Sequence, residues 1–383
     1  MAPKIKVGVI GYGFAAKSFH LPFIRAIPEY EVVAILQRAS APADPASVPK
    51  GTHCTVDIPG IKHYRTTEDF FAESGVDIVV VATHTDTHAS LAEGALRAGL
   101  HVIVDKPFAR STEEADRVIA LAREKGLLVT CFQNRRYDGD FKTVRELLAK
   151  NALGSLTEAE IHYDFDRAPW LHHMSEKKYT PGDGMAFGLG THSVDQAYVL
   201  FGRPASVTAF YRVHRGPIDS EVEDSFTIIL QYGESSSHPK LLVTIKTSVV
   251  SPMAQQLKFW IRGTAGSYLK FQQRSTCPQE EQIAHGVQPL DPEFGAEGDS
   301  LSGTLTTYEE FDGQLQTFDD KAERWVGKYP TTRGRWMGVY EDLAKAIRGE
   351  ADLAVRAEEV RDVLRIIELA RESSETGTTV HWK

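Results

Sequence analysis

The sequence has few cysteines, no long apolar run and no excess of positive charge. Its 383 residues contain three widely spaced cysteines without a CxxC pair, so a disulfide framework is excluded and a reducing compartment is expected. No apolar run approaches the roughly 20 residues that cross a bilayer. The amino terminus runs directly into a strand-like segment, so we expect no signal peptide and a cytoplasmic location.

The charge balance excludes further classes of partner. Forty-three basic against 52 acidic residues leave a formal net charge of −9, which gives no electrostatic reason to bind nucleic acid or an anionic membrane. Apolar residues make up 42% and charged residues 25%, as in ordinary globular proteins. The length predicts two domains.

The first third alternates short apolar runs with helix-length amphipathic segments, which predicts an α/β domain over residues 1–134. Because the runs are continuously apolar, they suit strands of a parallel sheet that are buried on both faces, in a doubly wound Rossmann arrangement. The expected strands are Lys6–Ile10, Val32–Leu36, Asp77–Ala82, His101–Val104 and Leu127–Phe132, and the expected helices are Ala15–Ile27, Thr87–Ala98 and Ser111–Lys125.

Residues 135–383 change to an α+β pattern. Consecutive strands without helices between them predict a large, mostly antiparallel open sheet. The expected strands are Leu156–Phe165, Ser206–Arg212, Glu223–Tyr232, Lys240–Val250, Gln256–Arg262 and Ser267–Phe271. We expect helices at Asp138–Lys150, Thr191–Phe201, Arg335–Arg348 and Ala357–Ser374, the last two able to pack back on the first domain, and a surface excursion over Cys277–Ser302.

A dinucleotide fingerprint follows the first strand. In GYGFAA, Gly11 permits the tight turn, Gly13 lets the backbone approach a pyrophosphate, and Ala16 lets the helix pack on the strand. Phe14 and Ala15 complete the segment that would face the cofactor. A strand before and a helix after the motif favour cofactor binding over a purely structural turn.

The end of the second strand bears on the choice of cofactor. NAD-selective sites place an acid there for the ribose 2′-hydroxyl, whereas this chain has Gln37-Arg38-Ala39-Ser40. Arg38 can pair bidentately with a 2′-phosphate, so NADP(H) is favoured. NAD(H) stays possible, because Arg38 could also be a solvated loop residue.

Lysine 106 lies at the carboxyl edge of the predicted parallel sheet, in Asp105-Lys106-Pro107. A lysine at this edge can hold a substrate oxygen by a charged hydrogen bond and stabilise alkoxide character during hydride transfer. We expect Asp105 to orient the lysine.

With these motifs in order, the sequence resembles the Gfo/Idh/MocA oxidoreductase family along essentially its whole length. The matching segments are GYGFAA, ATHTDTH (Ala82–His88), DKPFA (Asp105–Ala109), QNRRYD (Gln133–Asp138) and GDGMAFGLGTHSVD (Gly182–Asp195). FAAKSFHLPFI, QNRRYDGDF and HYDFDR are most similar to the NADP-linked scyllo-inositol dehydrogenase branch.

The resemblance implies roles for individual residues. Lys106 would contact nicotinamide ribose and substrate, and His192 would exchange the proton of the substrate hydroxyl, a role that suits histidine near neutral pH. The cofactor would be lined by a loop with Thr83, His84 and His88, together with Asp105. Asn134 and Arg135 would lie close to substrate, and Asn134 close to the nicotinamide as well.

One position departs from the family pattern. The usual aspartate four residues before the histidine is Gly188, which puts direct transfer of inositol specificity in doubt. Asp195, or Asp164 and Asp166 in HYDFDR, could supply a carboxylate, or could be ordinary surface acids. Tyr163 and Trp170 could stack on a substrate or serve in packing, and His172-His173 lacks partners at ligand spacing, so no metal site is expected.

The sequence therefore predicts an NADP(H)-dependent dehydrogenase or reductase of a sugar, polyol or related small molecule. Two alternatives stay open: a cofactor-binding sensor without turnover, favoured by Gly188, and a dehydrogenase of non-sugar substrates such as aromatic dihydrodiols. Open sheets of this family pair between subunits, so the resemblance implies a homodimer or tetramer.

Overall fold

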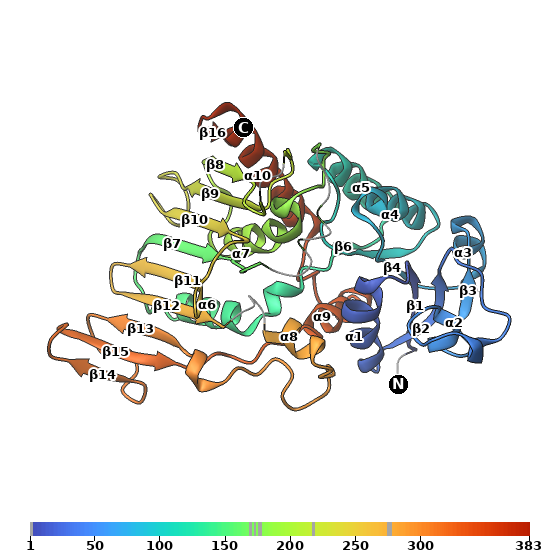
Figure 1. The fold of residues 1–383 in the computed structure, drawn as a ribbon, viewed down its shortest axis with the longest axis horizontal. Coiled ribbons are helices and arrows are strands. Elements are labelled where there is room, and N and C mark those ends of the chain that lie inside the picture. Colours follow the sequence, from blue (N-terminus) through green and yellow to red (C-terminus); the bar gives the residue numbers. More distant parts are fainter. Residues whose placement is uncertain (1–2, 168–170, 172–173, 175–177, 217–218, 274–277) are drawn as a thin grey trace. The chain divides into compact units, whose positions relative to one another are not determined.

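The chain forms two compact units in the computed structural model (Figure 1). The described residues are 3–167, 171, 174, 178–216, 219–273 and 278–383. The first unit comprises residues 1–134, 288–291 and 336–361, and the second comprises residues 135–287, 292–335 and 362–383. Within the described residues, no helix is both long and apolar enough to span a membrane.

The first unit is built on the predicted parallel sheet, which has six strands in the order β3-β2-β1-β4-β5-β6. The strands are β1 (Ile5–Ile10), β2 (Tyr30–Leu36), β3 (Lys62–Tyr64), β4 (Ile78–Val81), β5 (His101–Val104) and β6 (Val129–Cys131). Val9, Val79 and Ile103 are fully buried in their strands, which confirms the interpretation of the continuous apolar runs. Strand β3 was not expected, so His101–Val104 is the fifth strand along the chain rather than the fourth.

Helices connect these parallel strands. A π-helical turn, η1 (Ala16–His20), leads directly into α1 (Leu21–Ala26). The remaining helices of residues 1–134 are η2 (Pro45–Ser47), α2 (Cys54–Asp57), α3 (Thr67–Glu73), η3 (Thr85–Thr87), α4 (His88–Arg97) and α5 (Thr112–Lys125). Segment 336–361 adds α9 (Gly338–Ile347) and the first turn of α10 (Ala357–Thr376).

The second unit contains a ten-stranded sheet in the order β14-β15-β13-β12-β11-β7-β10-β9-β8-β16. Every pairing is antiparallel except that of β10 with β7, so the expectation of a mostly antiparallel sheet is confirmed. The strands are β7 (Leu156–His162), β8 (Ser206–Arg212), β9 (Ser225–Gln231), β10 (Leu242–Thr247), β11 (Gln256–Gly263), β12 (Gly266–Gln272), β13 (Gly303–Thr307), β14 (Gln316–Asp319), β15 (Arg324–Tyr329) and β16 (Val380–His381).

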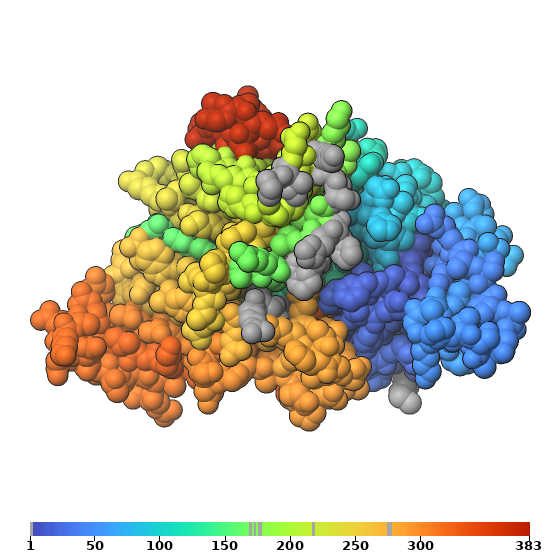
Figure 2. All heavy atoms as spheres, viewed as in Figure 1, coloured from blue at the N-terminus to red at the C-terminus, as the bar shows by residue number. Residues whose placement is uncertain are grey.

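The strands of this sheet alternate buried and partly exposed side chains, as β12 does along its whole length. The helices of the second unit are η4 (Asn134–Tyr137, whose first residue belongs to the first unit), α6 (Gly139–Ala149), η6 (Ala186–Gly190), α7 (Thr191–Phe201), α8 (Pro278–Ala284), η7 (Asp299–Leu301) and most of α10. The expected excursion over Cys277–Ser302 thus contains a helix, α8, and Cys277 itself lies outside the described residues. Strands β13 to β15, orange in Figure 2, and the two-residue β16 were also missed.

Candidate active site

The turn between β1 and η1 contains two glycines with different constraints. Gly11 has a φ of +100°, and a Cβ there would collide with the carbonyl oxygen of Ala82 at the end of β4. Gly13 lacks a positive φ, and a Cβ there would meet no described atom within 4 Å. The fold itself therefore requires glycine at Gly11, whereas Gly13 borders open space of the kind that a pyrophosphate needs.

That open space belongs to a cavity of about 1000 Å³ at the carboxyl ends of β1, β2 and β4. It lies where the strand order reverses, the usual ligand site of such sheets. Of the predicted cofactor residues, the cavity is lined by Gly11, Gly13, Phe14, Ala15, Arg38, Thr83 and His84. Ala16 is fully buried in η1, where its small side chain allows the helix to pack closely. The residues present fit a dinucleotide.

Sequence analysis missed one basic residue of this cavity. Arg65, just after β3, also lines the cavity, and its Nε donates to the carbonyl oxygen of Arg38 at 3.0 Å. Two guanidinium groups therefore lie where β2 and β3 end. Because β3 itself was not predicted, the sequence offered no signal that brings Arg65 beside Arg38.

His88 has a connecting role. It is buried at the start of α4, with Nδ1 2.7 Å from the carbonyl oxygen of Pro107 and Nε2 3.2 Å from that of Thr83. It does not line the cavity itself. Its ring instead links the loop that follows β4 to the Lys106-Pro107 segment that follows β5.

Asp105 is buried and holds the backbone of Lys106. Its Oδ1 accepts from the Lys106 backbone N–H at 2.7 Å and lies 3.7 Å from Nε2 of His20. Burial alone would raise the pKa of Asp105, but the nearby His20 and Lys106 keep it below its ordinary value. The carboxylate thus holds the backbone of Lys106, whose side chain is half-buried, and its effect on the ammonium group stays a prediction.

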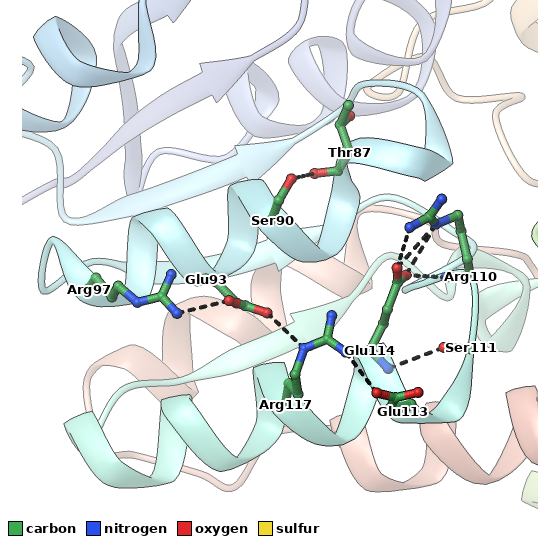
Figure 3. A network of polar contacts seen from close by, with 9 residues as sticks. All are labelled: Thr87, Ser90, Glu93, Arg97, Arg110, Ser111, Glu113, Glu114 and Arg117. Carbon is green, nitrogen blue, oxygen red and sulfur yellow. Dashed lines mark hydrogen bonds and ion pairs between the residues drawn. The ribbon is translucent and has the colours of Figure 1, made fainter.

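A polar network fixes the chain that follows Lys106 (Figure 3). Ser111 caps α5 by accepting from the backbone N–H of Glu114 at 3.2 Å. The Glu114 carboxylate accepts in turn from the backbone N–H of Arg110 at 3.0 Å and from its guanidinium. Burial opposes ionisation of Glu114, yet these bonds from Arg110 lower its pKa. The network therefore fixes the exit of the loop from Lys106.

In the second unit, His192 lies at the start of α7 and is buried. Its ring stacks on that of Tyr163, with centroids 6.4 Å apart and planes 18° apart. Gly188 lies four residues earlier, in the π-helical turn η6 that continues into α7. Because four residues make about one helical turn, Gly188 and His192 lie on the same side of this segment.

Tyr163 contacts a lysine that sequence analysis overlooked. Lys258 on β11 is fully buried, and its Nζ lies 3.3 Å from the centroid of the Tyr163 ring. Burial lowers the pKa of Lys258 to about 8. Neither the Lys258 ammonium nor the Tyr163 hydroxyl has a hydrogen-bond partner among the described residues. Lysine in an alternating strand pattern gave no sign of burial.

The remaining predicted substrate residues have varied surroundings. Arg135 is buried, with its guanidinium carbon 5.9 Å from the centroid of the Tyr163 ring. Asn134 is also buried. Asp166 is exposed and accepts from the backbone N–H of Ser251 at 3.3 Å. Trp170 and His172-His173 lie outside the described residues.

The two acids considered as replacements for the missing aspartate are already bonded. Asp195 is buried and accepts two bonds from Arg136, at 2.8 and 2.7 Å. Asp164 accepts from the backbone N–H of Ser248 at 2.8 Å and lies 2.9 Å from Nδ1 of His162. Both carboxylates therefore support local structure, and their contact with substrate stays a prediction.

Glu223 holds the turn that carries Gly188. Its carboxylate accepts from the backbone N–H of Ala186 at 3.0 Å and pairs with Arg371 on α10. A Cβ at Gly184 would collide with this carboxylate, so glycine is needed there. Burial raises the pKa of Glu223 despite the arginine. Sequence analysis did not identify Glu223, which is 31 positions from His192 along the chain.

One group of described residues has the composition of a metal site. Ligand atoms of His53, Cys54 and His63 lie within 4.8 Å of one another. Nε2 of His63 lies 2.8 Å from the carbonyl oxygen of Gln37, and Nδ1 of His53 lies 2.9 Å from the Thr55 hydroxyl. The His63 bond ties β3 to the loop after β2 and the His53 bond is local, so we assign the group to a structural role.

Both units match family models. Residues 5–133 match the oxidoreductase family with an NAD-binding Rossmann fold, and residues 141–269 match the Gfo/Idh/MocA C-terminal domain. An uncharacterized oxidoreductase of Schizosaccharomyces pombe is 33% identical over 99% of each chain. Bacillus subtilis scyllo-inositol 2-dehydrogenase (NADP(+)) IolW is 29% identical over 98% of this chain and 95% of the relative.

Two further comparisons extend this picture. Mus musculus trans-1,2-dihydrobenzene-1,2-diol dehydrogenase is 24% identical over 67% of this chain and 75% of the relative. A crystal structure of an oxidoreductase from Bacillus cereus superposes with a TM-score of 0.83, at 25% identity and 99% coverage of both chains. With both units matched in order, a site for a nicotinamide dinucleotide in the first and His192 in the second, the chain belongs to the Gfo/Idh/MocA family of oxidoreductases.

Proposed function

We propose that this oxidoreductase uses NADP(H) and acts on a secondary alcohol, or the corresponding carbonyl, of a sugar, polyol or related small molecule. The observation that carries the cofactor choice is the pair Arg38 and Arg65 at one end of the cavity. Guanidinium groups match a 2′-phosphate in charge and hydrogen-bonding geometry. Glu68 and Asp86 also line the cavity, on α3 and η3, but no carboxylate follows β2 directly.

The substrate class is supported by the printed activities of two relatives. One is named for scyllo-inositol and the other for a trans-1,2-diol, and both substrates carry neighbouring hydroxyl groups on a six-membered carbon ring. Lys106 supports the same class, because a charged donor beyond β5 suits an oxygen that gains negative charge.

In this proposal the bound nicotinamide supplies or accepts the hydride. The ammonium group of Lys106 donates a hydrogen bond to the reacting oxygen and stabilises its developing charge. The imidazole of His192 takes up or returns the hydroxyl proton. Asp105 keeps Lys106 in place through its backbone N–H, and Tyr163 supports the His192 ring by stacking.

The test is turnover of a panel of polyols, aldoses and ketones with each cofactor, followed by Lys106→Met. This substitution keeps much of the apolar stem and removes the charge, so we expect kcat on the best substrate to fall by about 10²–10³-fold. NADPH affinity should change far less, because the turn at Gly11 and Gly13 holds the pyrophosphate independently. Stopped-flow turnover and fluorescence titration measure the two quantities.

Lys125→Met, on the exposed end of α5, is the matched control and should turn over normally. A folded Lys106→Met protein that binds NADPH and keeps wild-type kcat would exclude the proposed role of the lysine. Tight NADPH binding by the wild type without turnover of any panel compound would favour a sensor instead.

A further inference from the structure

A second pocket, within the second unit, lies one helical turn from His192. Its volume is about 360 Å³, and its walls include Gly188 on the η6 turn and three residues of helix α8. Gly188 precedes His192 by four residues on a continuous helical segment, so one wall of the pocket lies about one helical turn along the chain from His192.

Glycine at position 188 leaves room for a ligand. Gly188 has no positive φ, and a Cβ built there would meet only the side chain of Met185, at 3.4 Å from its terminal carbon. Neither backbone conformation nor close packing therefore requires glycine. Met185, Leu189 and Phe165 make the neighbouring wall apolar, as expected for the carbon skeleton of a small molecule.

The pocket is also lined by the carboxylate of Glu280, which an ion pair holds. Oε2 of Glu280 on α8 lies 2.5 Å from a terminal nitrogen of Arg135. The Arg135 side chain is 5% exposed, whereas that of Glu280 is 43% exposed. Oε1 of Glu280 has no hydrogen-bond partner among the described residues. The ion pair thus anchors one oxygen and leaves the other accessible.

The charge balance around Arg135 defines what this carboxylate can bind. The guanidinium also lies 3.6 Å from Asp138, and although burial opposes its charge, Glu280 and Asp138 raise the pKa of Arg135. Arg135 stays charged, but it is shared between two carboxylates, and Glu281 also lines the pocket, so the pocket carries an excess of negative charge. An ionised carboxylate only accepts hydrogen bonds, so the accessible oxygen of Glu280 suits a hydroxyl donor.

We propose that Glu280 determines specificity by accepting a hydrogen bond from a hydroxyl group next to the reacting carbon, so that the pocket beside Gly188 selects vicinal diols over simple secondary alcohols. This inference rests on the proposed function, because it takes the reacting alcohol to lie at His192. It adds a residue from α8, within a stretch of sequence that carries no family motif.

The experiment compares trans-1,2-cyclohexanediol with cyclohexanol, which differ by one hydroxyl group, as substrates with NADP⁺. Glu280→Gln keeps the shape and an acceptor for Arg135 but removes the charge. We expect kcat/KM for the diol to fall roughly 10- to 100-fold, as the loss of a charged hydrogen bond implies, mainly through a higher KM. For cyclohexanol, kcat/KM should change far less.

Glu293→Gln, an exposed acid on the loop after α8, is the matched control and should behave as wild type. Gly188→Leu fills the pocket without touching the ion pair, so it should also reduce diol turnover selectively. NADPH affinity and thermal unfolding of each variant check that the protein is folded. Equal losses for both alcohols, or none, in Glu280→Gln and Gly188→Leu would overturn the inference.

If the wild type oxidises neither alcohol and no other panel compound, the proposed function fails. The role of Glu280 is then tested by calorimetry, which measures the affinity of the NADPH complex for the diol. Diol binding that is at least 10-fold weaker in Glu280→Gln still supports the assignment, whereas equal affinity or no binding to the wild type overturns it.

Discussion

At the scale of single residues, the structure distinguishes glycines that the fold requires from glycines that leave room for a ligand. Gly11 would be needed in any protein with this β1–η1 turn, since its φ is positive and Ala82 blocks a side chain. Neither Gly13 nor Gly188 has a backbone constraint: a Cβ at Gly13 would meet no described atom within 4 Å, and one at Gly188 would make an ordinary contact with Met185. Gly13 in the first unit and Gly188 in the second therefore mark positions where a bound ligand can approach the backbone.

Single residues also determine the proposed preference for NADPH over NADH. Arg38→Ala should weaken NADPH binding, by roughly 1–3 kcal/mol for a lost charged hydrogen bond, and leave NADH affinity nearly unchanged. Arg65→Ala should give a smaller loss of the same selectivity, because its Nε also orients the backbone of Arg38. Isothermal titration with both cofactors measures the effect.

Arg25→Ala, on α1 and outside this cavity, serves as the control. If both cofactors lose affinity equally on replacement of Arg38, the arginine does not bind the 2′-phosphate.

At the scale of elements, the parallel sheet was predictable because strands that are buried on both faces appear in the sequence as continuous apolar runs. Val79 and Val80 of β4 belong to such an apolar run. Strand β3 has three residues, Lys62–Tyr64, none of them buried, and the Thr- and Gly-rich β13 carries no apolar run, so neither was recognised. Helix α8 was also not predicted, because the glycines, prolines and acidic residues around it are typical of a surface loop.

The residues of the candidate site also fall into those that the sequence indicated and those that it did not. Gly11, Lys106 and His192 were found because they belong to contiguous motifs. Glu280 and Lys258 were missed because only the tertiary fold brings them near Arg135 and Tyr163. A single sequence carries no signal for such pairs.

The start of α5 is a separate determinant of the loop that carries Lys106. Ser111→Ala should remove the cap on Glu114 and lower the free energy of unfolding by about 1 kcal/mol. Urea denaturation of the full chain, followed by circular dichroism, measures this loss. Ser90→Ala is the comparison, because the exposed Ser90 hydroxyl only donates to the carbonyl oxygen of Thr87 within the first turn of α4 (Figure 3), and its loss should be much smaller. Equal destabilisation by both substitutions would show that the cap has no special role.

At the scale of the whole molecule, the ten-stranded sheet has one face that the chain itself covers only partly. Partly exposed side chains form a row across neighbouring strands, in which Ile229 is paired to Thr244 and Trp260 is paired to Leu269. Glu160 on β7 lies between Thr244 and Trp260 and is paired to both. A broad sheet face that combines aromatic and aliphatic side chains with a few polar ones suits a protein–protein interface. We propose that a second copy of the chain covers this face, in a homodimer or a tetramer.

This proposal predicts that the oligomer depends on the centre of the row. Trp260→Asp would place a charge on the face where two copies would meet, and burial of an unpaired charge costs several kcal/mol, so we expect monomers at micromolar concentration. Light scattering coupled to size-exclusion chromatography measures the mass, against 42.5 kDa for one chain. Leu290→Asp changes an exposed apolar residue of the first unit and should leave the mass unchanged. A wild-type protein that elutes as a monomer, or a Trp260→Asp protein that keeps the wild-type oligomer, would exclude this face as the interface.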